Sequence, residues 1–107
     1  MKIGVSATGG SMDAQVEPRF GRCPYFLIVD SETMKFEAFS NPATSLPGGA
    51  GPRTVQEFKQ RGAEVILTGH VGPNAQSALE QAGLEVITGV SGTVREAVEQ
   101  FKKQRSL

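Results

Sequence analysis

The side chains best suited to hold a metal or a sulfide-bearing ligand are the single histidine and the single cysteine, His70 and Cys23. Imidazole is the commonest protein metal ligand, and His70 lies between an expected strand end and an expected helix start, where open α/β sheets bind ligands. Arg19 and Arg22 precede Cys23, and their charges favour a thiolate and hence a soft metal. Cys23 also fits a structural role as a small buried hydrophobe. We therefore predict that a metal or sulfide-bearing ligand is contacted by His70, and we rank His70 ahead of Cys23 as the contact residue.

Two expected helices begin with the dipeptide Gly-Pro, at Gly51-Pro52 and Gly72-Pro73. Proline suits the first helical position because the N–H group that it lacks has no intrahelical partner there. The other unpaired N–H groups and the helix dipole attract anions. Gly-Pro is also simply a good helix start, so both an anion site and a structural role remain open. Neither segment continues as Gly-Lys-Ser/Thr or forms GxGxxG, and a nucleotide site is therefore not indicated.

The charge around these segments favours an anion. Eleven Lys+Arg balance eleven Asp+Glu over the whole chain, which gives no general attraction to nucleic acid or to an anionic membrane. No acidic residue, however, occurs between residues 37 and 57 or between residues 64 and 80, and Arg19, Arg22 and Arg53 lie in or beside the same segments. If these segments converge in the fold, an anion meets a positively charged pocket rich in backbone amides.

The sequence has few of the residues and motifs that a hydrolytic enzyme requires. The only aspartates are Asp13 and Asp30, and the first expected strand carries Ser6 where a two-metal nuclease needs a carboxylate. No Gly-x-Ser-x-Gly motif is present. A single cysteine cannot form an intrachain disulfide or a four-thiolate cluster site, and it is typical of a reducing cytoplasm. No apolar run reaches the ~18–20 residues of a membrane span. The sequence therefore predicts a cytoplasmic binding protein rather than an enzyme.

The elements that must position these residues form a single domain, residues 1–107. The hydrophobic pattern predicts two hairpin-like pairings in the first half and alternating helices and buried strands in the second, which is typical of parallel βα units. The element order is thus β-β-β-α-β-α-β-α, an α/β fold with one mixed sheet flanked by helices. The expected strands are 2–7, 25–30, 34–39, 64–68 and 85–88, and the expected helices are 52–61, 73–82 and 93–103.

The first strand is expected in the interior of the sheet, paired with 25–30 and parallel to 64–68. This arrangement brings Thr8-Gly9 and the segment 68–70 to one edge of the sheet, where we expect a crevice. The long uncharged segment 40–51 is expected to be a loop that is mobile without ligand.

Several segments together resemble a known family. They are PRFGRCPYFLIVD (Pro18–Asp30), Asn41-Pro42, GGAG (Gly48–Gly51), TGHVGPNA (Thr68–Ala75) and SGTVREAV (Ser91–Val98). In this order they resemble the dinitrogenase iron–molybdenum cofactor biosynthesis family, the NifX-like proteins and the C-terminal domain of NifB-like proteins. The resemblance implies a ribonuclease-H-like fold with a five-stranded mixed sheet. It also implies a non-catalytic carrier of a metal–sulfur cluster: an iron–sulfur cluster, an iron–molybdenum cofactor precursor or, as in small orange-protein-like members, a molybdenum–copper sulfide.

Transferred to this chain, the resemblance places the cargo among the arginines and glycines described above, with His70 and Cys23 as the candidate metal ligands. Its partners would be the cluster and a donor or acceptor protein, without nucleic acid or membrane, and the chain would be a monomer or a weak homodimer. A regulatory or scaffolding module that binds a partner protein or an oxyanion is the alternative. The predicted cofactor-binding residues are Arg19, Arg22, Cys23, Gly48, Gly49, Gly51, Arg53, Gly69, His70, Gly72 and Asn74.

Overall fold

The chain folds around one five-stranded mixed sheet in the computed structural model, which describes residues 1–106. The strand order is β3-β2-β1-β4-β5; β2 is antiparallel to both β1 and β3, and β4 is parallel to both β1 and β5. This confirms the predicted mixed sheet and the interior place of the first strand. The strands are β1 (Lys2–Ala7), β2 (Tyr25–Asp30), β3 (Phe36–Ser40), β4 (Val65–Leu67) and β5 (Glu85–Ile87).

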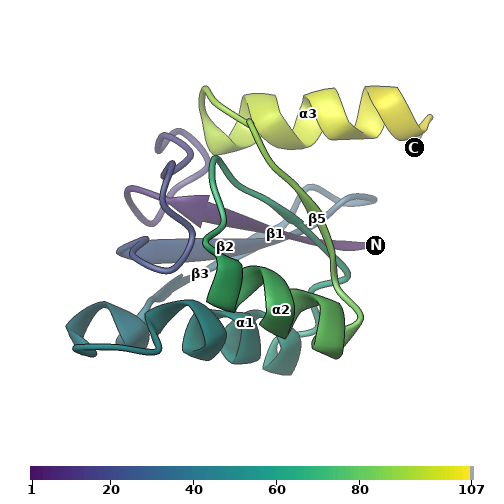
Figure 1. Ribbon diagram of the computed structural model, residues 1–107. Helices are drawn as coiled ribbons and strands as arrows, with labels where there is room; N and C mark the ends of the chain where they lie inside the picture. Colours follow the sequence, from purple (N-terminus) through teal and green to yellow (C-terminus); the bar gives the residue numbers. More distant parts are fainter. Residues whose placement is uncertain (107) are drawn as a thin grey trace.

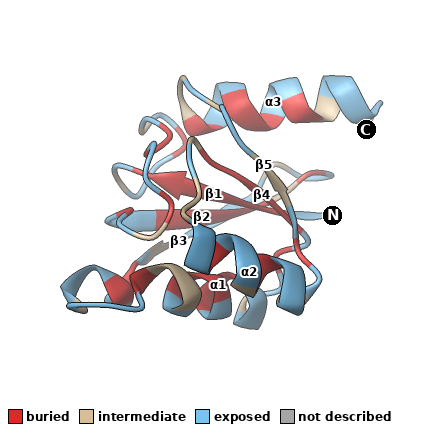
Figure 2. Ribbon diagram, viewed as in Figure 1, coloured by how far each residue is buried: buried red, intermediate tan, exposed pale blue. Residues whose placement is uncertain are grey.

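Helices cover both faces of the sheet. α1 (Ala50–Gln60) and α2 (Pro73–Ala82) pack on one face, and α3 (Val94–Arg105) packs on the other (Figure 1). Because side chains alternate along a strand, the sheet contributes to two core layers. One layer joins Val5 and Leu67 to Phe101 of α3, and the other joins Ile66 to Phe58 of α1. The three central strands, β1, β2 and β4, are accordingly almost entirely buried, whereas the outer strand β3 is largely exposed (Figure 2).

The segment predicted as a loop, residues 40–51, is partly helical. A 3-10 turn, η1 (Pro42–Ser45), begins where the Asn41 side chain accepts a hydrogen bond from Ala43 N–H. α1 then starts at Ala50, two residues before the predicted start, after Gly49 with φ of +73°. Pro52 thus occupies the third helical position rather than the first, which costs no hydrogen bond because that N–H group is also unpaired. The mobility of this segment stays a prediction.

The third strand also starts later than predicted, at Phe36 instead of Met34. Met34 has φ of +60° and closes the turn by donating its N–H to Asp30 O, so the extended backbone begins after it. α3 begins with a capping box, in which Thr93 and Glu96 exchange hydrogen bonds between side chain and backbone. No helix within residues 1–106 combines the length and the apolar character that crossing a membrane requires.

Candidate anion-binding site

The starts of α1 and α2 meet at one place on the surface. Between them and the loop of Gly21 and Arg22 lies a shallow depression of about 260 Å³. Its lining brings together five of the predicted site residues, Arg22, Gly49, Gly51, Gly72 and Asn74. The residues that complete the lining are Gly21, Ala50, Pro52, Pro73 and Ala75.

Two glycines allow this close approach. A methyl group at Gly51 would lie 2.8 Å from Cβ of Ala75, so a larger residue would separate the two helix starts. A methyl group at Gly21 would lie 2.9 Å from the backbone nitrogen of Gly51, so the loop also contacts α1 through its backbone. Glycine is therefore required for packing at both positions, in addition to any contact with a ligand.

The depression presents backbone donors. Neither helix start has a side-chain cap or an acidic residue in its first turn. The first helical N–H donations come from Arg53 in α1 and from Gln76 in α2, so the earlier N–H groups have no intrahelical partner. These groups belong to Ala50, Gly51, Asn74 and Ala75. Two helix dipoles therefore act on the same space, and both favour a negative charge there.

Arg22 supplies the positive charge at this depression. Its guanidinium group donates to the carbonyl oxygens of Leu46, at 3.0 Å, and Thr44, at 3.5 Å. It makes no ion pair within residues 1–106, so its charge is not neutralised there. Arg22 therefore links the loop to η1 and to the residue that follows it, and keeps a net positive charge beside the helix starts.

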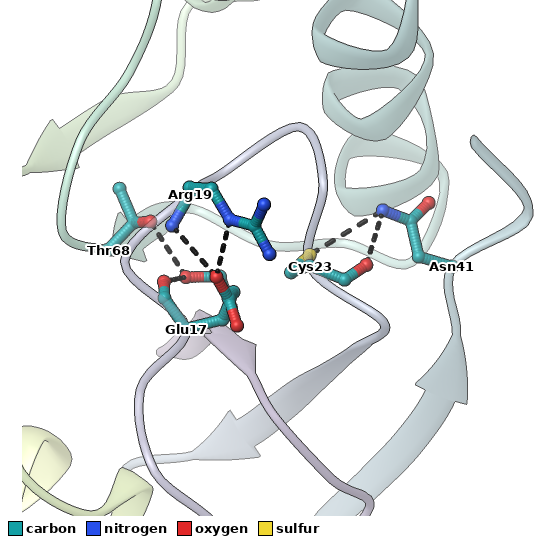
Figure 3. Close-up of polar contacts among 6 residues, drawn as sticks. Glu17, Arg19, Cys23, Asn41 and Thr68 are labelled. Atoms are coloured by element: carbon teal, nitrogen blue, oxygen red, sulfur yellow. Dashed lines mark hydrogen bonds and ion pairs between the residues drawn. The ribbon is translucent and has the colours of Figure 1, made fainter. Parts of the chain in front are cut away.

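Arg19 and Arg53 are less available as counter-charges than the sequence predicts. Arg19 Nε lies 3.1 Å from the carboxylate of the buried Glu17 (Figure 3). Arg53 lies 3.6 Å from the carboxylate of Glu57 on the next turn of α1. Each is therefore paired already, and neither lines the depression.

The crevice expected at the ends of β1 and β4 is filled. Residues 17–20, the crossing segment, run over these strand ends. His70 N–H donates to Pro18 O at 2.6 Å, and Phe20 N–H donates to His70 O at 3.2 Å. The hydroxyl groups of Ser6 and Thr68 lie 2.7 Å apart, and that of Ser6 donates to Glu17 O of the segment at 2.8 Å. The two strand ends do share one edge, as predicted, but the chain itself occupies the space between them.

His70 and Gly69 therefore hold the crossing segment against the end of β4. The backbone of His70 pairs with that of Arg19, and Gly69 contacts the backbone of Pro18. The imidazole is exposed, but His70 does not line the depression. Gly48 is exposed and adjoins the depression through Gly49. The predicted contact of His70 with a ligand stays a prediction.

The expectation that the neighbouring arginines favour a thiolate at Cys23 is wrong. Its side chain is fully buried in the core layer under α1, and burial raises the pKa of the thiol to about 12. A hydrogen bond from Asn41 Nδ2, 3.5 Å from Sγ, opposes this shift without cancelling it (Figure 3). The thiol is thus neutral and lies within the core. No three His, Cys, Asp or Glu side chains converge in residues 1–106 as a metal site.

Sequence reasoning missed one organising residue, Asn41. It is buried, and its Nδ2 donates to Cys23 O and to Thr54 Oγ1, each at 3.0 Å. Thr54 Oγ1 in turn donates to Ala50 O in the first turn of α1 at 2.8 Å. Asn41 thereby fixes the loop before β2 against the start of α1. The sequence predicted a loop over residues 40–51, but it gave no signal that the side-chain amide of Asn41 would be buried.

Fold and site together define a small α/β domain in which two uncapped helix starts and an arginine line one surface depression. Comparison with known protein families shows to which family this domain belongs. The chain matches the family described as dinitrogenase iron-molybdenum cofactor over residues 1–104, and it belongs to this family.

Solved structures agree with this assignment. The chain is similar to the apo form of the orange protein from Desulfovibrio gigas, with 42% identity, a TM-score of 0.93, and coverage of 97% of this chain and 88% of that one. It is also similar to a putative NifB protein from Thermotoga, with 33% identity, a TM-score of 0.83, and coverage of 97% and 89%. Among curated proteins, MJ0580 from Methanocaldococcus jannaschii is 28% identical over 90 residues, which covers 81% of this chain and 76% of that one.

Proposed function

We propose that this protein is a non-catalytic cytoplasmic carrier that holds an anionic metal–sulfur cluster in the depression between α1 and α2. The observation that carries the proposal is the convergence of two uncapped helix starts beside the unpaired charge of Arg22. Membership of the iron-molybdenum cofactor family indicates the kind of cargo. The candidates are an iron–sulfur cluster, an iron–molybdenum cofactor precursor and a molybdenum–copper sulfide.

The cargo would be held mainly by charge and hydrogen bonds. Sulfide ligands on the surface of a cluster are negatively charged and accept hydrogen bonds from N–H groups, which this depression supplies from two helices. The buried thiol of Cys23 offers no metal bond in this conformation. A contact from the exposed imidazole of His70 would add a metal bond from a neighbouring loop, as the sequence predicts.

The first experiment loads the purified protein under anaerobic conditions with tetrathiomolybdate, with and without copper(I), and separately with iron and sulfide. After desalting, visible absorbance, metal content and acid-labile sulfide are measured. Stable colour with stoichiometric metal supports a carrier. Protein that stays colourless and metal-free under all three conditions contradicts it.

Asn74→Asp is the sharpest variant for locating the site. It keeps the size of the side chain and adds a negative charge to the lining of the depression. An acid in the first turn of a helix stabilises the helix, so we expect unchanged or higher stability but about tenfold weaker loading. Gln100→Glu, an exposed change of the same kind on α3, is the control and should load like the parent. Equal loading of both variants would place the cargo elsewhere.

Substitutions of His70 and Cys23 test the two predicted ligands. We expect His70→Ala to lower retention of the cluster, because the variant loses the imidazole that would bind the metal. Loss in Cys23→Ala with full retention in His70→Ala would reverse this ranking. Full retention in both variants would leave the backbone amides and Arg22 as the groups that hold the cargo.

The alternative, a regulatory or scaffolding module that binds an oxyanion, is favoured by one observation. The lining donors are N–H groups, and no soft ligand lines the depression. The same experiment separates the two functions when molybdate is titrated beside tetrathiomolybdate. Binding of molybdate at least as tight as that of tetrathiomolybdate, with no stable cluster formed, would support the oxyanion module.

A further inference from the structure

β3 forms one outer edge of the sheet, and its outward backbone groups are unpaired. Asp30 N–H donates to Lys35 O, and Asn41 N–H donates to Pro24 O, which shows that the odd-numbered residues face β2. In an antiparallel pair the next residue along faces the other way. The N–H and C=O groups of Phe36, Ala38 and Ser40 therefore point away from the sheet, and none has another partner within residues 1–106.

The α3 face of this edge carries exposed aromatic side chains. α3 packs over the centre of the sheet and leaves β3 uncovered (Figure 1). Phe36 is 42% exposed and Tyr25 of the neighbouring strand is 38% exposed. They are two of the three exposed large hydrophobic residues in the described part of the chain. An open strand edge flanked by exposed aromatic residues is a site for association with another strand.

The opposite face of the same edge carries a complementary pair of charges. Glu37 is exposed and makes no ion pair among residues 1–106. The guanidinium carbon of Arg61 lies 4.1 Å above the ring of Phe39, two residues further along β3. Arg61 also lies 3.6 Å from the carboxylate of Glu57, which it shares with Arg53, so a second carboxylate at Arg61 would complete the balance of two arginines with two acids. Glu37 and Arg61 line the same surface hollow of about 410 Å³.

We propose that two copies of this chain associate through β3, antiparallel and related by a two-fold axis at Ala38, to form a continuous ten-stranded sheet. In this register Phe36 of one copy pairs with Ser40 of the other, and all outward backbone groups of β3 find partners. Glu37 lies opposite Phe39 of the second copy and therefore beside the Arg61 that covers that ring. The two-fold axis forms this ion pair twice, because each copy supplies both charges.

Other registers are less favourable. An axis at Glu37 would place the two Glu37 carboxylates directly opposite each other, where like charges repel. It would also place Ser40 opposite Met34, outside β3 of the second copy, so the outward backbone groups of Ser40 would stay unpaired. An axis at Phe36 uses outward groups but leaves Ser40 without a partner in the second copy's strand. The register centred on Ala38 is the one that combines complete pairing with complementary charge.

The arrangement keeps the two candidate anion sites separate. β3 leads directly into η1 on the side of the depression, and antiparallel pairing places these ends of the two copies at opposite ends of the joint edge. Each copy therefore retains its own site, and the dimer would hold one cargo per chain. The dimer does not depend on the proposed cargo, since none of the groups in it lines the depression.

The test measures the mass of the unloaded protein by sedimentation equilibrium over roughly 5 to 500 μM, the range for a dimer of modest interface area. The parent should pass from the mass of one chain to twice that mass. Glu37→Lys replaces both ion pairs by repulsion and should raise the dimer dissociation constant about tenfold or more. Glu99→Lys, an exposed change of equal charge on α3, is the control and should dimerise like the parent.

A second variant tests the backbone pairing. Ala38→Pro removes an outward N–H group and no hydrogen bond to β2, so it should abolish the dimer while leaving the monomer folded by circular dichroism. If this variant does not fold, Glu37→Lys decides the outcome. A parent that stays monomeric throughout the range would overturn the proposal, and so would a dimer that persists in Glu37→Lys. Loading with tetrathiomolybdate is measured separately, so failure of the dimer and failure of the carrier function are distinguishable.

Discussion

Gly69→Ala is the substitution whose consequence the structure determines most directly. A methyl group at this position would lie 2.6 Å from Pro18 Cα and 2.7 Å from Pro18 O. Both contacts are with backbone atoms, which cannot move aside by changing a rotamer. The crossing segment, residues 17–20, must therefore separate from the end of β4.

The cost follows from the contacts that hold the segment. Separation breaks two backbone hydrogen bonds, His70 N–H to Pro18 O and Phe20 N–H to His70 O. Each is worth about 1 kcal/mol net, and a buried group left without a partner adds to this, so we expect a loss of about 2–3 kcal/mol in the free energy of unfolding. For a domain of this size such a loss lowers Tm by roughly 8–24 °C.

The assay is urea unfolding followed by circular dichroism, with a thermal melt as a second measurement. Gly48→Ala is the matched control because nothing lies within 4 Å of a methyl group there. It should change stability by less than about 1 kcal/mol, and the reduced freedom of the unfolded chain favours a gain. A Gly69→Ala protein as stable as the parent would refute the packing of residues 17–20 on the sheet.

Three further perturbations probe other parts of the molecule. Cys23, with a pKa raised to about 12, should react with iodoacetamide at pH 8 at least ~1000-fold more slowly in the folded than in the unfolded protein, and rapid modification of the native state would contradict its burial. Asn41→Ala should lower the free energy of unfolding by about 3 kcal/mol because it leaves several buried groups unpaired, whereas the exposed Asn74→Ala should change it little. Hydrogen bonds from the backbone and side chain of Thr93 lower the pKa of Glu96, so its contribution to stability is full above its unfolded pKa and is lost as the pH falls through the folded value. Glu96→Gln should weaken this acid dependence, which urea unfolding at a series of pH values measures.

Much of the fold could be predicted because the sequence patterns were local. The apolar strand Lys2–Ala7 and the helix Pro73–Ala82 were predicted with the bounds that the structure shows. The start of α1 could not be predicted in the same way. Gly49, Ala50 and Gly51 have no side chain that marks a helix, and the start depends on the left-handed backbone of Gly49 and on packing against Ala75. Such a contact between distant segments leaves no periodic signal in the sequence.

The candidate site was predictable to the extent that it is made of backbone. Glycines before helices indicated unpaired N–H groups, and five of the predicted residues do line one depression. Side-chain predictions depended on distances that the sequence does not contain. The charges of Arg19 and Arg22 suggested an ionised Cys23, but Glu17 pairs with Arg19, and burial raises the pKa of the Cys23 thiol. Proximity in sequence was therefore a poor guide to electrostatics at Cys23.

A site made of backbone donors has a consequence for the proposed carrier. Metal–thiolate bonds hold a cluster strongly but must be exchanged when the cluster leaves, whereas N–H groups and Arg22 release an anion without breaking a covalent bond. The donors on α1 and α2 are kept together by the close contact of Gly51 with Ala75, so the cradle is formed before the cargo arrives. Preorganisation supports affinity, and the absence of a thiolate from the lining supports exchange. A protein that receives a cluster from one partner and delivers it to another requires both properties.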